Sequence, residues 1–344
     1  MNRTRKLGLS IFMSSLLALG LTACGGADDT AGGSDDSAGS GGGTELSLVA
    51  YAVPKVGFDK LIPAFEKTPD GKGVTFKQSY GASGDQSRKV ESGLDTDIVN
   101  FSVEPDVTRL VKAGLVDDDW NKDANKGLAF GSVVTIVTRK GNPKKIKDFS
   151  DLLQPGLEVV TPNPFSSGSA KWNLLAPYAA ESGGGKDKKA GLDFVDKLVK
   201  DHVEVQPKSG REATETFLQG TGDVLLSYEN EAIFAKRQGE KVDYVTPPTT
   251  FKIENPVAVL SKSKNKEKAE AFKEFMYSDK GQELWAEAGF RPVNETVAKK
   301  FAKDFPAPDK LWTIDDLGGW DTVDTEFFDP DKGSIAKTYN EATE

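Results

Sequence analysis

Short runs of apolar and β-branched residues alternate along most of this chain with stretches in which apolar residues recur every three or four positions. The run Ser132–Thr138 (SVVTIVT) is the clearest example of the first kind, and its β-branched side chains favour a buried strand. Strands that alternate with helices are typical of an α/β protein with a largely parallel sheet. The pattern therefore predicts an α/β fold.

The expected elements form two series. The first contains strands Leu46–Tyr51, Val74–Gln78, Asp97–Phe101 and Ser132–Thr138 and helices Phe58–Phe65, Gly84–Glu91 and Pro105–Ala113. The second contains strands Leu157–Thr161, Val203–Gln206 and Asp223–Ser227 and helices Ala170–Ala180, Leu192–Lys200 and Glu212–Leu218. Two more strand candidates lie within Tyr244–Leu260, and helices Lys266–Tyr277 and Gln282–Ala288 follow.

This order suits two α/β lobes, with the second inserted into the first. We expect residues 44–134 and 250–344 to form the first lobe and residues 135–249 the second. Two strands, near 132–138 and within 244–260, would cross between the lobes. Because ligands of open α/β sheets lie beyond the carboxyl ends of the strands, the predicted binding site is the interlobe cleft, closed by hinge bending.

The first 23 residues have a different character. Arg3, Arg5 and Lys6 precede an apolar run from Leu7 to Leu21, which is typical of a secretory signal peptide. The run is too short for a membrane-spanning helix. We therefore expect an extracytoplasmic protein.

The apolar run ends in Leu-Thr-Ala-Cys24-Gly, which looks like a bacterial lipobox. That resemblance implies cleavage before Cys24 and lipidation of its thiol, which would anchor the protein to the cell membrane. The alternative is a spectator cysteine in a discarded peptide. Residues 24–43 are Gly, Ser, Ala and Asp almost throughout, so we expect them to form a flexible tether.

Composition excludes several classes of function. A net charge of -9 and the absence of a basic-aromatic patch make a nucleic-acid partner unsuitable. The only cysteine is Cys24, so no intramolecular disulfide is possible, and one histidine leaves no zinc or copper site. We expect no cofactor and no metal.

Three segments share a strand, a turn with glycine and then a helix. They are Thr161–Trp172 (TPNPFSSGSAKW), Tyr80–Gln86 (YGASGDQ) and Lys208–Glu212 (KSGRE). Helix N-termini carry unpaired N–H groups and a partial positive charge, and glycine lets the backbone approach a ligand closely. Serine is also simply a good N-cap residue, but Ser-Ser-Gly-Ser offers more donors than one cap uses. The segments predict an anion site built from neutral donors.

Neutral donors suit an anion that only accepts hydrogen bonds. Sulfate carries no proton near neutral pH, whereas phosphate keeps one and gains from an acceptor such as Asp. Each charge-assisted hydrogen bond contributes roughly 1.5–3 kcal/mol before desolvation, so several are needed. Arg211 follows Gly210 and would add a positive charge, either in the pocket or behind it.

The chain resembles the bacterial sulfate-binding proteins that feed sulfate/thiosulfate ABC importers, in their lipoprotein branch. The segments that carry the resemblance are Ser79–Gln86, Arg139–Pro143, Thr161–Asn173, Gly222–Val224, Glu229–Ala232 and Gly318–Trp320. They span nearly the whole mature domain in the same order. The resemblance implies a type II periplasmic-binding-protein fold, a monomer, and permease subunits of the importer as partners.

The family binds dehydrated sulfate through backbone N–H groups and neutral side chains. Carried onto this chain, the resemblance implies hydroxyl donation by Ser83 and Ser167 and N–H donation by Gly168, Ser169 and Gly210. The hydroxyl of Ser169 would be an added donor or a rim group.

Two positions depart from the family pattern. Ala52 stands where the family has an Asp that contributes its backbone N–H, which Ala52 could still donate. Tyr228 stands where the family has a Trp that donates its indole N–H. A phenol both donates and accepts, whereas an indole N–H only donates.

Three rival functions remain open at this stage. A hydrolase would have to use His202, which we expect at the surface, and neither serine cluster has the Gly-x-Ser-x-Gly elbow. A binding protein for another oxyanion, such as molybdate or phosphate, would use the same kind of site. A structural or adhesive surface lipoprotein is the third alternative. The favoured function is the capture of sulfate or thiosulfate for import, without enzymatic activity.

Overall fold

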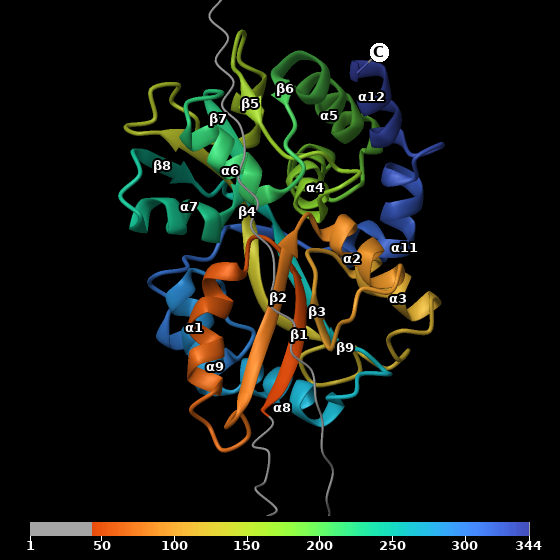
Figure 1. The fold of residues 1–344 in the computed structure, drawn as a ribbon. Coiled ribbons are helices and arrows are strands. Elements are labelled where there is room, and N and C mark those ends of the chain that lie inside the picture. Colours follow the sequence, from red (N-terminus) through yellow and green to blue (C-terminus); the bar gives the residue numbers. More distant parts are fainter. Residues whose placement is uncertain (1–42, 344) are drawn as a thin grey trace, which may run out of the picture. The chain divides into compact units, whose positions relative to one another are not determined.

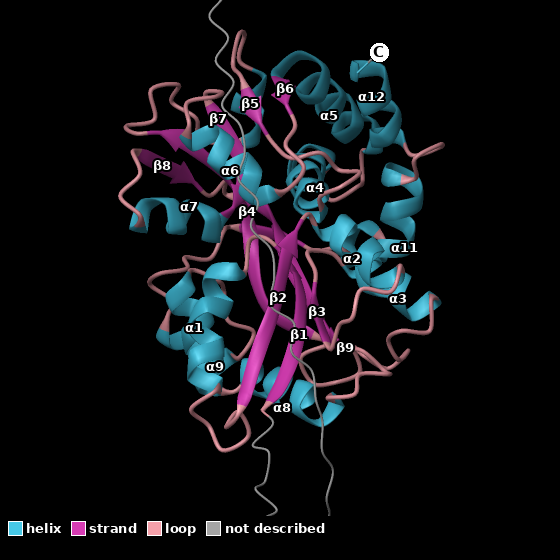
Figure 2. Ribbon diagram, in the orientation of Figure 1, coloured by secondary structure: helices cyan, strands magenta, loops and turns pink. Residues whose placement is uncertain are grey.

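The computed structural model describes residues 43–343, and its strands form one ten-stranded sheet in that range (Figures 1 and 2). The expected signal peptide of residues 1–23, Cys24 and tether residues 24–42 lie outside the described residues. Helices alternate with the strands as predicted, which confirms the α/β fold. Within residues 43–343, no helix combines the length and apolar character needed to cross a bilayer.

The strands lie in the order β2-β1-β3-β9-β4-β7-β5-β6, with β8 beside β4 and β10 beside β9. Their bounds are β1 Thr44–Tyr51, β2 Val74–Gly81, β3 Ile98–Asn100, β4 Leu128–Arg139, β5 Val159–Val160, β6 Val203–Val205, β7 Val224–Tyr228, β8 Val242–Val245, β9 Thr249–Val259 and β10 Lys310–Trp312. Pairing is parallel within β2-β1-β3 and within β7-β5-β6. These two parallel groups are the sheets of the two lobes.

Two long antiparallel strands connect the lobes. β4 pairs with β9 through Leu128–Val133 and with β7 through Val134–Thr138. β9 continues to β3 through Val257–Val259. β9 is thus paired with the first-lobe strands and β4 with the second-lobe strands, and the pairing of β4 with β9 joins the two groups, as expected for the two crossovers (Figure 2).

Helices cover both lobes. They are α1 Lys55–Phe65, α2 Ser83–Glu91, α3 Glu104–Lys112, α4 Gly168–Ser182, α5 Lys188–His202, α6 Gly210–Leu218, α7 Glu229–Arg237, α8 Lys266–Tyr277, α9 Asp279–Ala288, α10 Glu295–Lys300, α11 Gly319–Val323 and α12 Ser334–Thr343. Most residues of α4 are buried, so this helix is a core element of the second lobe rather than a surface helix.

We expected residues 250–344 in the first lobe. The C-terminal segment, residues 310–343 from β10 to α12, packs on the second lobe instead. α12 lies against α5, where Thr338 Oγ1 donates to Asp196 Oδ1 at 3.0 Å (Figure 1). The rings of Tyr178 and Phe327 meet with centroids 4.8 Å apart. The cause lies in β10, which pairs with the start of β9 and returns the chain toward the second lobe.

An aromatic cluster fills the core between the first-lobe sheet and helices α1 and α9. Trp285 contacts Phe58 edge-on at 5.1 Å and Phe130 at 4.2 Å between ring centroids. Gly57 makes this packing possible, because a Cβ there would lie 2.0 Å from Cζ3 of Trp285.

Gly57→Ala should therefore lower the free energy of unfolding by at least about 1–3 kcal/mol, the usual cost of overpacking a core. Urea unfolding monitored by circular dichroism measures the change. Lys60→Ala, on the exposed side of the same helix, is the control and should leave stability nearly unchanged. Equal stability of Gly57→Ala and the wild type would contradict this account of the core.

Candidate functional site: an anion site between the lobes

Three helices begin next to the interlobe contact, at the positions that the sequence singled out. α2 begins at Ser83, α4 at Gly168 and α6 at Gly210, and the residue before each has an extended backbone. The first N–H groups of a helix have no partner inside it. Within residues 43–343, no protein acceptor receives the backbone N–H of Ser83, Gly168, Ser169 or Gly210.

Local hydrogen bonds shape the turns that lead into these helices. Asn163 Oδ1 accepts from Phe165 N at 2.8 Å and Asn163 O from Ser167 N at 2.9 Å, which tightens the turn before α4. Ser209 Oγ accepts from Glu212 N at 3.2 Å and caps α6. Ser167, by contrast, makes no side-chain cap bond and is buried. Its hydroxyl is therefore free for a ligand rather than used as a cap.

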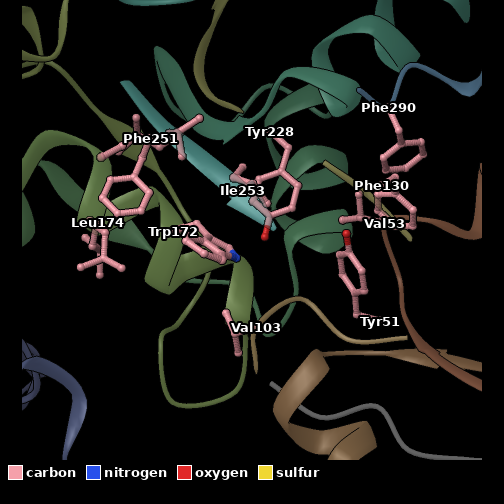
Figure 3. Packing of buried hydrophobic residues seen from close by; sticks show 14 of the residues in the cluster. Tyr51, Val53, Val103, Phe130, Trp172, Leu174, Tyr228, Phe251, Ile253 and Phe290 are labelled. Atoms are coloured by element: carbon pink, nitrogen blue, oxygen red, sulfur yellow. The ribbon is translucent and has the colours of Figure 1, made fainter. Parts of the chain in front are cut away.

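Ser102, between β3 and α3, joins the elements around the site. Its N–H donates to Ser83 Oγ at 2.9 Å, and its carbonyl accepts from Trp172 Nε1 at 2.8 Å. Its hydroxyl lies 2.7 Å from the Tyr228 hydroxyl. Figure 3 shows the Trp172 nitrogen and the Tyr228 oxygen turned toward the same region. Ser102 thus holds α2 of the first lobe against α4 and β7 of the second.

Glycines allow the two lobes to come this close. A Cβ on Gly168 would lie 2.8 Å from Ser102 Cβ of the first lobe, and one on Gly210 would lie 3.3 Å from Val53 Cγ2 of the first lobe and 2.8 Å from Ser169 Oγ of its own lobe. Gly84 N donates to Ser166 O at 3.1 Å, a direct backbone bond between α2 and the turn before α4. The predicted residues Ser83, Gly168, Ser169 and Gly210 are therefore brought together around one point.

Tyr228 ends β7 and is 1 % exposed. Burial raises the pKa of its phenol, while hydrogen bonds with Ser102, Ser169 and Asn255 partly oppose the rise. The phenol therefore keeps its proton at any physiological pH. It supplies a hydroxyl at the position where we expected a ligand contact.

The Ser83 hydroxyl has a different partner from the one we expected. It donates to Asp106 Oδ2 at 2.6 Å, and Arg109 Nη1 holds the other carboxylate oxygen at 3.0 Å. The backbone N–H of Ser83 is the donor left for an anion. Hydroxyl donation to a ligand would require this bond to change.

Arg211 lies behind the start of α6 rather than in front of it. Its Nη2 is 2.7 Å from Glu231 Oε1 and 3.3 Å from the carbonyl of Val53. Burial raises the pKa of Glu231, whereas the Arg211 charge and the Thr214 hydroxyl oppose the rise. The guanidinium charge is thus compensated inside the protein.

Ala52 follows β1 and is half-buried. Its N–H donates to Gly81 O at 2.9 Å, so it is engaged within the first lobe. An anion contact through Ala52 would require this bond to be exchanged, and the role stays a prediction.

The cations beside the site are paired. A cavity of about 180 Å³ next to α2 and α4 is lined in part by Arg88, Arg109 and Lys171. They pair with Asp85, Asp106 and Asp324 respectively. A dianion would therefore meet oriented N–H and O–H groups rather than an uncompensated positive charge.

Sequence reasoning missed Ser102, Asp106 and Asn255. Asn255, on the crossover strand β9, is completely buried, and its Nδ2 donates to Ser102 O at 3.2 Å. Ser102 had a usable signal, since it stands between a strand and a helix as Ser83 does. Asp106 and Asn255 had none, because only tertiary packing brings them to the site.

His202 is buried rather than at the surface as we expected. Its Nδ1 lies 2.9 Å from Leu157 O, so the ring packs where α5 ends and has a structural role. Among the residues that the structure describes, no group of three or more His, Cys, Asp and Glu side chains could hold a metal ion.

Comparison with known proteins decides the family. The profile described as "Bacterial extracellular solute-binding protein" matches residues 46–291. The chain belongs to this family. Within it, the chain groups with the sulfate- and thiosulfate-binding proteins.

Similar proteins extend over most of the chain. The sulfate-binding protein of Synechococcus elongatus is 39% identical over 93% of this chain and 92% of its own length. The thiosulfate-binding protein of Pseudomonas aeruginosa is 36% identical over 93% of this chain and 96% of its own. The solved sulfate-binding protein SubI from Mycobacterium tuberculosis H37Rv has 61% identity and a TM-score of 0.82, and the match covers 83% of this chain and 100% of SubI.

Gly168→Ala tests whether the start of α4 belongs to the binding site. The added methyl group would press on Ser102 and shift the N–H groups of Gly168 and Ser169, so sulfate affinity should fall at least tenfold in calorimetry. Gly57→Ala is the matched control, because it overpacks a core site outside the cleft. If both variants bound sulfate like the wild type, α4 would have no part in the site.

Proposed function

We propose that this protein captures sulfate or thiosulfate between its lobes and delivers the anion to an ABC importer. The observation that carries the proposal is the convergence of unpaired backbone N–H groups at three helix starts, with Tyr228 and Ser169 hydroxyls beside them. The sulfate- and thiosulfate-binding relatives support the same anions. Ser83, Ser167, Gly168, Ser169, Gly210 and Tyr228 are the proposed contacts, with Ala52 after exchange of its present bond and Arg211 acting from behind α6.

The electrostatics of the helix starts favour an anion that is permanently ionised. A dianion placed between helix N-termini meets several partial positive charges and oriented donors. The nearby Asp106 does not repel it strongly, because its carboxylate is held by Ser83, Arg109 and the fold around them. Release requires only that the lobes separate, since no covalent bond or fixed cation retains the ligand.

The contacts across the cleft suit a binding protein that closes on its ligand. Trp172 and Tyr228 reach Ser102 from the second lobe, and Ser166 O accepts from Gly84 N. Bending of β4 and β9 would break these few bonds together and expose the helix starts. The protein would therefore bind and release the anion as a monomer, with the importer's permease subunits as its partners and without a catalytic step.

Isothermal titration calorimetry with sulfate, thiosulfate, molybdate and phosphate tests the proposed function. Sulfate or thiosulfate should bind most tightly, in line with the sulfate- and thiosulfate-binding relatives of this chain. Added sulfate should also raise the unfolding temperature, since a ligand that binds only the folded state stabilises it. Heat from molybdate or phosphate but none from sulfate or thiosulfate would contradict the proposal.

We further propose that Cys24 carries a lipid anchor after removal of residues 1–23. The family is extracellular, and the lipobox-like sequence before Cys24 supports attachment to the membrane. Cys24→Ser should move the protein from the membrane fraction to the medium when it is expressed in a Gram-positive host. Ser14→Ala, in the apolar run, is the control and should leave it in the membrane fraction. Membrane retention of the Cys24→Ser protein would refute the anchor.

A further inference from the structure

A buried ion pair joins the two lobes beside the point where β4 changes its partner strand. Nε and Nη2 of Arg291 donate to the two carboxylate oxygens of Glu229 at 2.7 and 2.9 Å. Glu229 is completely buried, and the Arg291 side chain is 19 % exposed. The guanidinium thus binds both carboxylate oxygens, a geometry that fixes the angle between the two groups as well as their distance.

Each partner of the pair is anchored in a different lobe. Arg291 lies between α9 and α10 of the first lobe, where its N–H and its carbonyl exchange hydrogen bonds of 2.9 Å with Gly131 of β4. Its Nη2 also donates to Pro306 O at 2.9 Å. Glu229 is the first residue of α7 in the second lobe. The pair therefore relates the positions of two structural elements rather than of two loose side chains.

The pair lies beside the part of the crossover that must bend when the lobes separate. β4 pairs with β9 up to Val133 and with β7 from Val134, which is opposite Tyr228. A cavity of about 480 Å³ is lined by residues 131–133 of β4, by residues of β9 and by Arg291 itself. The strands have room to bend at this point, so the ion pair next to them is in a position to set the angle between the lobes.

The angle between the lobes matters for the proposed anion site because Tyr228 directly precedes Glu229. The Tyr228 hydroxyl lies 2.7 Å from Ser102 Oγ of the first lobe. Hydrogen bonds weaken beyond about 3.2 Å between heavy atoms, so a small rotation at the hinge would separate the donors of the two lobes. Arg291 lines the hinge cavity, and neither it nor Glu229 lines the cavity beside α2 and α4.

We infer that Arg291 and Glu229 are positioning residues for anion binding, because their ion pair sets the angle at which the lobes close. The inference rests on the proposed function. Neither side chain contacts the anion. The pair acts through Tyr228 and the helix starts, which it holds at the distance where donors of both lobes can bind one anion together.

The double variant Glu229→Gln/Arg291→Met removes the ion pair without leaving an unpaired buried charge. Calorimetry should show at least a tenfold loss of sulfate affinity relative to the wild type, because the lobes no longer close at the angle where their donors meet. Glu283→Gln/Lys300→Met is the matched control, since it makes the same charge changes at an ion pair within the first lobe. The control should keep the affinity of the wild type.

The distance between the lobes is a readout that a purely structural role would not change. Cys24 is the only cysteine, so the Cys24→Ser chain can carry spin labels at Lys60→Cys on α1 and Lys189→Cys on α5, both exposed positions. With sulfate, double electron–electron resonance should give one narrow distance distribution for the labelled chain and a broader or shifted one after removal of the pair. Gly57→Ala, which lowers stability in the core, should keep the narrow distribution.

A second variant keeps the test valid if the double variant does not fold, as judged by circular dichroism. Arg291→Lys retains the charge and one hydrogen bond but loses the two-pronged geometry, so its sulfate affinity should fall at least threefold and its distance distribution should broaden. Folded variants with the affinity and distances of the wild type would overturn the inference. Loss of affinity at an unchanged interlobe distance would overturn it as well, whereas a wild type that does not bind sulfate would overturn the proposed function instead.

Discussion

The hydrogen bonds of Ser102 are the interaction on which the site depends. One residue uses its N–H, its carbonyl and its hydroxyl to bind Ser83, Trp172 and Tyr228. Two of these partners come from the second lobe and one from the first. Because Ser102 is completely buried, none of the three bonds is shared with water, and together they fix how the helix starts of the two lobes face each other.

Charge is compensated around this point before any ligand arrives. Asp106 is satisfied by Ser83 and Arg109, and Arg211 is paired with the fully buried Glu231. Removing either arginine would leave a buried carboxylate, Asp106 or Glu231, without its counter-charge, which costs several kcal/mol. The ionised side chains near the helix starts are thus paired within the protein, and the groups left without a protein partner there, within residues 43–343, are backbone N–H groups with their partial charges.

The C-terminal segment strengthens the second lobe rather than completing the first. Trp320 of α11 packs edge-on against Trp172 at 4.8 Å between ring centroids, and α12 covers α5. Trp172 is the same side chain that reaches Ser102 across the cleft. Trp320, near the end of the chain, therefore helps to orient Trp172, a residue that joins the lobes.

The sequence by itself determined the α/β order, the two crossover strands and the three helix starts, because periodicity, β-branching and the glycine and serine turns are local signals. It also marked Gly168 and Gly210, whose lack of a side chain is needed where backbones meet. Only the tertiary structure decided that the Ser83 hydroxyl turns to Asp106, that Arg211 turns to Glu231, and that Ser102 and Asn255 lie in the site. These contacts depend on which buried polar groups come together when the chain packs. Ser83 and Asp106, like Ser102 and Asn255, are far apart in the sequence, so no local sequence pattern predicts that they form hydrogen bonds.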